Sequence, residues 1–111
     1  MAKKLQLRNF PDDGAPVTVT TTESEADGII LEISQGGVVK YFASIRTNGV
    51  TELKVPSGVY RFNFHYSKAA GSAKITSAVE TPTGKFPKSA ANGSGTAEQG
   101  EHGLTAYRVE V

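Results

Sequence analysis

The stretch "VTELKVPSGVYRFNFHYS", residues 50–67, alternates apolar and polar residues on both sides of a Pro-Ser-Gly turn. Such alternation is typical of β-strands with one buried face, because successive side chains of a strand point to opposite sides of the sheet. Pro56 presets the turn and Gly58 eases the exit from it. The segment therefore predicts two antiparallel strands, 50–55 and 59–66, that pair as a hairpin.

The rest of the chain follows the same pattern. No segment has a convincing helical period, and the runs rich in Val, Ile, Thr, Tyr and Phe are bounded by Gly, Pro and Asn. At 111 residues the chain is long enough for one core. We expect a single all-β domain over residues 1–111, an antiparallel β-sandwich or jelly roll with about eight strands. The predicted strands are 3–9, 17–22, 28–34, 38–46, 50–55, 59–66, 73–80 and 104–111.

Strand pairing is predicted from the rule that residues directly opposite each other share a face of the sheet. A three-residue loop at 35–37 sets Ile33 against Val39, which keeps both in the core. A bulged turn at 47–49 and a four-residue connection at 56–59 extend this pairing into a four-stranded meander. Its inner face carries Ile29, Leu31, Ile33, Val39, Tyr41, Ala43, Ile45, Leu53, Val55, Tyr60, Phe62, Phe64 and Tyr66.

One sheet cannot cover so much apolar surface, so a second layer is expected. The remaining strands supply it with Leu5, Leu7, Val17, Val19, Ile75, Val79, Leu104, Tyr107, Val109 and Val111. The opposite face of the meander is polar and includes Glu32 and His65. Two apolar residues break this polar face, because the predicted register places Ile30 opposite Phe42. We interpret Ile30 and Phe42 as a contact patch, the alternative being a cross-strand pair covered by a local loop.

Two further segments are candidates for contact with a partner. The N-terminal arm or edge strand, residues 1–10, contains Lys3, Lys4 and Phe10. The Gly-rich segment 82–103 has no clear strand pattern, and long loops of this kind are usually functional or disordered. Within it, the candidate contact residues are Lys85, Phe86 and Lys88.

Composition argues against several classes of partner. Twelve Lys and Arg residues against eleven Asp and Glu residues give a net charge of +1, which supplies no general field for nucleic acid or an anionic membrane. The start "MAKKLQLRNF" lacks the apolar segment of a secretory signal, and no run approaches the length of a membrane span. The chain has no cysteine, which suits a reducing compartment. We expect no nucleic-acid or membrane partner.

Few residues form a pattern that carries chemistry. The chain contains neither the G-x-S-x-G motif of hydrolases nor a phosphate-binding G-x-x-x-x-G-K-S/T loop, and we expect neither an enzyme nor a cofactor. Carboxylate pairs for glycoside chemistry stay open, because their spatial separation decides. The best metal candidate groups Glu98, Glu101 and His102, joined by His65. These ligand types suit zinc, but the spacing is not diagnostic, and a solvated loop with no metal is the prediction.

Two resemblances bear on function. The stretch "LKVPSGVYRFNFHYS", residues 53–67, resembles the hairpin of C1q-type jelly rolls, in which Pro, Gly and alternating Tyr and Phe precede a His. The whole chain is similar to the capsid decoration or staple proteins of short-tailed bacteriophages, with a short start, no Cys, about eight strands and a long Gly-rich loop. This second resemblance implies a β-sandwich on the outer capsid surface that bridges coat subunits as a homodimer.

The predicted function is therefore that of a structural virion protein, made in the host cytoplasm, that binds the major capsid protein and stabilises the shell. The alternative is a carbohydrate- or ligand-binding β-sandwich module. Sugar sites usually present aromatic faces, and this chain has no Trp. Exposure of Tyr107 and Phe86 beside Asn92 or His102 would favour the alternative.

Overall fold

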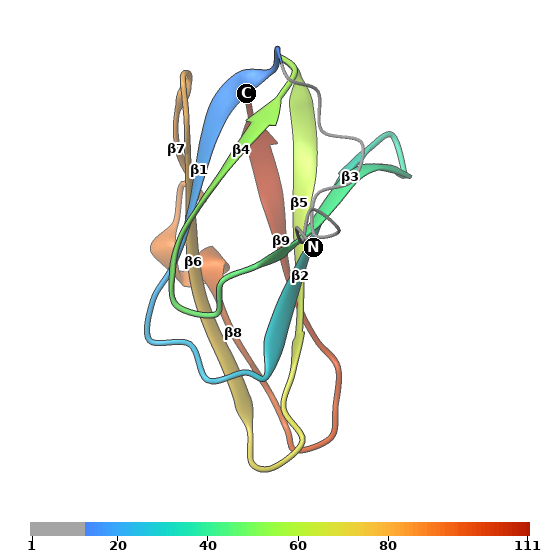
Figure 1. Ribbon diagram of the computed structural model, residues 1–111, viewed down its shortest axis with the longest axis vertical. Coiled ribbons are helices and arrows are strands. Elements are labelled where there is room, and N and C mark those ends of the chain that lie inside the picture. Colours follow the sequence, from blue (N-terminus) through green and yellow to red (C-terminus); the bar gives the residue numbers. More distant parts are fainter. Residues whose placement is uncertain (1–12) are drawn as a thin grey trace, which may run out of the picture.

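The computed structural model describes residues 13–111 and consists of two antiparallel β-sheets packed face to face (Figure 1). The elements in chain order are β1 (Ala15–Thr21), β2 (Gly28–Gln35), β3 (Val38–Ile45), β4 (Gly49–Val55), β5 (Val59–Ser67), β6 (Ala73–Thr81), β7 (Gly84–Phe86), the 3₁₀ helix η1 (Ala90–Gly93), β8 (Ser94–Ala97) and β9 (Gly103–Glu110). The prediction of an all-β sandwich is confirmed.

Each sheet combines strands that are distant in the sequence. Sheet A has the strand order β3-β2-β5-β9, and sheet B has the order β4-β1-β6-β7, with β8 also paired to β6. The two short strands lie along the same strand, since β8 pairs with the first half of β6 and β7 with its end. Figure 1 shows β7 and the β2–β3 hairpin on opposite sides of the molecule.

The space between the sheets holds one hydrophobic core. Alternate residues of each strand face it, as the period-two pattern predicts. Every predicted core position within residues 13–111 is buried except Tyr41, which is half-buried, and Val39 and Leu104, which are exposed. Leu104 points outward because its neighbours Gly103 and Thr105 take the inward positions of β9.

The predicted four-stranded meander is wrong. Strand β4 pairs with β1 in sheet B, whereas β5 pairs with β2 and β9 in sheet A. The Pro-Ser-Gly segment is therefore an arch between sheets, closed by a hydrogen bond from Tyr60 Oη to the carbonyl of Pro56 at 3.0 Å. The connection from β3 to β4 also crosses between the sheets. There the Asn48 side chain accepts from the Ser24 amide at 2.8 Å and donates to the Ser24 carbonyl at 3.0 Å.

The β2–β3 hairpin is present, but its predicted register is wrong. Ile33 pairs with Tyr41, and Gln35 pairs with Val38 across a two-residue turn. Gly36 and Gly37 form that turn with φ values of +60° and +81°, a left-handed conformation that glycine adopts without strain. A register shift at Ile33/Ser34 adds a residue to β3 and turns Val39 outward.

The segment 82–103 is not the unbroken loop that the sequence predicted, because it contains β7, η1 and β8. These elements place Phe86 and Ala97 in the core. The predicted strand over 3–9 lies outside the described residues. Within residues 13–111, no helix has the length and apolar character needed to cross a membrane.

Candidate functional site

The outer face of sheet A carries the candidate site. One lateral row crosses all four strands of the sheet: Ser44, Ile30, His65 and Leu104 are successive cross-strand partners. In the next row, Phe42 pairs with Glu32, and Glu32 pairs with Asn63. Since diagonal neighbours on a sheet face are within reach of long side chains, Glu32 and His65 are placed to interact.

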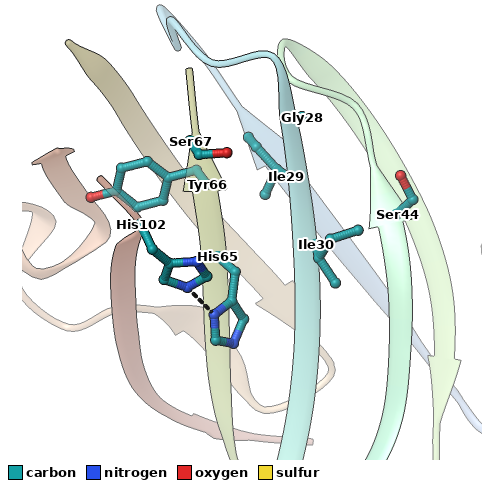
Figure 2. Close-up of a pocket in the computed structure, with 8 residues that line it drawn as sticks. All are labelled: Gly28, Ile29, Ile30, Ser44, His65, Tyr66, Ser67 and His102. Atoms are coloured by element: carbon teal, nitrogen blue, oxygen red, sulfur yellow. Dashed lines mark hydrogen bonds between the residues drawn. The ribbon is translucent and has the colours of Figure 1, made fainter. Parts of the chain in front are cut away.

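His65 is the centre of a three-residue cluster that also contains Glu32 and His102. The Nε2 atom of His65 lies 2.6 Å from Oε1 of Glu32. On the other side of the ring, Nδ1 of His65 lies 2.7 Å from Nε2 of His102, and Figure 2 shows the two imidazoles in this contact. We call these three residues the histidine cluster. Their hydrogen bonds form a continuous path from a carboxylate through two imidazoles.

The position of His102 depends on the glycine that follows it. Gly103 opens β9 and pairs with Tyr66 of β5. A Cβ atom at Gly103 would lie 2.3 Å from Cε2 and 2.5 Å from Cζ of the buried Tyr66 ring. Only a residue without a side chain permits this approach, which brings the loop before β9 against β5 and places His102 beside His65.

A hollow of about 310 Å³ adjoins the two histidines. Its wall includes Ile30, Ser44, Tyr66 and Ser67 as well as His65 and His102 (Figure 2). The side chain of His65 keeps 25% of its surface exposed, so the cluster is accessible from solvent. Within residues 13–111, the hydrogen bonds of both imidazoles connect members of the cluster and involve no hydroxyl group.

Exposed apolar side chains flank this cluster. Ile30, Phe42 and Leu104 are 43%, 38% and 55% exposed. Ile30 and Leu104 lie on either side of His65 in the lateral row, and Phe42 faces Glu32 from β3. We call Ile30, Phe42 and Leu104 the outer patch. Large apolar groups gathered on one face of a closed domain are typical of a contact surface.

The structure places the predicted contact residues at separate locations. Ile30 and Phe42 share the exposed outer face of sheet A, as predicted, but they are diagonal neighbours because Ile30 faces Ser44. Lys3, Lys4 and Phe10 lie outside the described residues. Leu104, which the sequence assigned to the core, joins the same face.

Phe86, one of the predicted contact residues, is buried. It belongs to β7, where it is 3% exposed and packs in the core, because the short strand turns its side chain inward against β6. Lys85 is exposed on the same strand, and Nζ of Lys88 lies 4.5 Å from the centroid of the Phe86 ring. These lysines are part of the margin of sheet B, away from the outer patch on sheet A.

The four residues of the metal candidate are only partly brought together. His65 and His102 contact each other, as the candidate group required. The carboxylate in contact with His65, however, is that of Glu32 on β2, and not that of Glu98 or Glu101. Within the described part of the chain, no three acidic or histidine side chains converge on one point where together they could hold a metal ion. Sequence reasoning grouped His65 with His102 and placed Glu32 on the same outer face as His65, but it did not join Glu32 to the two histidines.

Comparison with known proteins does not identify a relative. No family model, curated protein or solved structure matches the chain.

Proposed function

We propose that the chain is an accessory structural protein of a bacteriophage virion, which binds the outside of a coat-protein shell and stabilises it by bridging subunits. The observation that carries this proposal is the outer patch, where Ile30, Phe42 and Leu104 are exposed on one face of a domain with a closed core. Such a face contributes binding free energy when a partner covers it.

The mechanism requires no catalysed reaction, cofactor, membrane or nucleic acid. A protein that binds the assembled shell and not free subunits shifts the assembly equilibrium toward the shell by mass action. The proposal includes a symmetric homodimer, since a two-fold axis gives each accessory particle two equal contact faces. The chain supplies a rigid face because the backbone beneath the outer patch belongs to a four-stranded sheet.

Co-sedimentation with purified coat shells of short-tailed bacteriophages tests the proposal. We expect saturable binding and a higher disruption temperature of the shells. Replacing Ile30, Phe42 and Leu104 together by Thr should weaken binding by about tenfold or more, since about 1.4 kcal/mol of lost burial corresponds to a factor of ten. Light scattering on the isolated chain measures whether it forms the homodimer.

The matched control is Val50→Thr. Val50 is 50% exposed, like the residues of the outer patch, but it lies on β4 in sheet B. This variant should bind shells as the original chain does. Equal binding by the triple variant, or no binding of the original chain to any shell, would contradict the proposal.

The alternative is a carbohydrate- or ligand-binding module, and the hollow beside His65 is the observation that favours it. The aromatic platform that a sugar site usually requires is not found where the sequence suggested it, because Tyr107 and Phe86 are 6% and 3% exposed. A glycan screen with the isolated chain distinguishes the two functions. A clear glycan signal without shell binding supports the module.

A further inference from the structure

We propose that His65 and His102 form a binding site for one divalent transition-metal ion, Zn²⁺ foremost, and that Glu32 orients His65 from behind. The site lies beside the hollow on the outer face of sheet A. It is independent of the proposed function, because metal binding is a property of the isolated chain. Four features support the inference: the carboxylate partner of His65, the distance between the imidazoles, the placement of the two histidines by the fold and the open space beside them.

The hydrogen bond to Glu32 determines which nitrogen of His65 is available. A carboxylate oxygen accepts, so Nε2 of His65 donates its proton to Oε1 of Glu32 across 2.6 Å. In the neutral ring, Nδ1 then carries a lone pair, and this is the atom that faces His102. A carboxylate behind an imidazole is the usual outer partner of a metal-bound histidine, where it fixes the tautomer and the ring orientation.

The distance between the imidazoles is close to that of two ligands on one ion. Nδ1 of His65 and Nε2 of His102 are 2.7 Å apart, and in the metal-free pair one proton lies between them. Zinc–nitrogen bonds of about 2.0–2.1 Å at a tetrahedral angle separate two ligand atoms by about 3.3 Å. The two nitrogens therefore need to separate by about 0.6 Å, and both rings need to turn so that their lone pairs converge on the ion. The proton of His102 moves from Nε2 to Nδ1 when the ion binds Nε2.

The fold brings both histidines together before any ion binds. His65 lies on β5, an inner strand of sheet A that pairs with β2 and β9. His102 directly precedes Gly103, whose close approach to the ring of Tyr66 places the loop. Preorganised ligands lose little conformational freedom on binding, which favours affinity.

The remaining coordination positions are open to solvent or to a further ligand. Glu32 is engaged with the far side of His65, so the site has two protein ligands; consistent with this, no three-ligand group is found within residues 13–111. The adjoining hollow of about 310 Å³ has room for water ligands. Imidazole nitrogen suits Zn²⁺, Ni²⁺ and Cu²⁺, whereas Ca²⁺ and Mg²⁺ prefer oxygen ligands.

The sequence makes the test unusually direct, because the chain has two histidines and no cysteine. Zn²⁺ is titrated calorimetrically into the whole chain after treatment with a chelator, and imidazole ¹⁵N resonances are followed by NMR. We expect one ion per chain, bound through Nδ1 of His65 and Nε2 of His102. Titration with Ca²⁺ under the same conditions should give no signal.

Three variants separate the roles of the residues. His102→Asn should abolish Zn²⁺ binding, and its exposed loop position leaves the core intact. Glu32→Gln should weaken binding by about 10–100-fold, the usual effect of losing an outer carboxylate partner. The matched control, Glu80→Gln, makes the same charge change on β6 in sheet B and should bind as the original chain does.

Unchanged Zn²⁺ affinity in His102→Asn, or no Zn²⁺ binding by the original chain, would overturn the site. If Glu32→Gln and Glu80→Gln bind Zn²⁺ with equal affinity, the orienting role of Glu32 is overturned. Neither result bears on shell binding, which is measured separately with the outer-patch variant. The two proposals therefore fail independently.

Discussion

The hydroxyl group of Tyr107 lies inside the sandwich and joins its two sheets. Its Oη atom is 2.9 Å from Oγ of Ser77 on β6, and Ser77 donates to the carbonyl of Gly93 in η1 at 2.9 Å. Tyr107 itself belongs to β9 of sheet A. Burial raises the pKa of Tyr107. The neutral phenol is therefore the form that the folded protein favours.

The raised pKa of Tyr107 predicts that the folded protein loses stability in alkali. The folded-state pKa lies above the value of about 10 in the unfolded chain, so the stabilisation is complete below about pH 10 and is lost as the pH rises toward the folded value. The free energy of unfolding should fall by up to about 1.4 kcal/mol per pH unit above about pH 10 from this group alone. Urea unfolding measured at several pH values checks the slope.

Tyr107→Phe is the comparison that isolates this contribution. The pKa of Tyr60 is also raised, through burial and then through its neighbour Tyr41, so part of the alkaline loss remains in the variant. The variant should nevertheless lose stability less steeply than the original chain. Parallel slopes for the two proteins would show that Tyr107 is not responsible.

At the scale of the strands, alternation predicts which residues face the core but not which strand is the partner. Val55 and Tyr60 are both buried, as predicted, yet they belong to facing sheets and not to one hairpin. A hairpin and an arch place the same residues in the core, because the inner faces of a sandwich meet. The pattern in the sequence is identical for both, so tertiary pairing alone decides between them.

In the candidate site, too, local alternation predicts which way side chains point, whereas tertiary pairing decides which of them meet. Ile30, Glu32 and His65 lie on the outer face of sheet A because local alternation fixes their direction, and the sequence predicted this. The contact between His65 and His102 depends on β9 pairing with β5 from far along the chain. The local pattern contains no information about that pairing, so the sequence suggests His65 and His102 only as candidate ligands of one group and does not predict Glu32 as their partner.

The junction of β5 and β9 is tested by Gly103→Ala. The new Cβ would lie 2.3 Å from the buried Tyr66 ring, so the variant should lose about 1–3 kcal/mol of stability, as overpacked sites do. The matched control is Gly28→Ala, since a Cβ there meets no atom within 4 Å and should change stability by less than about 0.5 kcal/mol. Equal urea midpoints for both variants would contradict the close approach.

The whole molecule is held together by connections that pass repeatedly between the sheets. The chain changes sheet between β1 and β2, between β3 and β4, between β4 and β5, between β5 and β6, and between β8 and β9. Both sheets also contribute to one core cluster, and Ser77 and Tyr107 bridge them with a buried hydrogen bond. Neither sheet can separate without exposing the apolar face of the other.

This interlocking predicts that residues 13–111 unfold in one cooperative step. The chain has no Trp, so tyrosine fluorescence reports on the core through Tyr60, Tyr66 and Tyr107, while far-ultraviolet circular dichroism reports on strand content. Urea midpoints from the two signals should coincide, as they do for two-state domains. A fluorescence transition that precedes the loss of circular dichroism would mean that the core opens while strands persist. In that case the shared core, and not strand pairing, would be the weaker part of the fold.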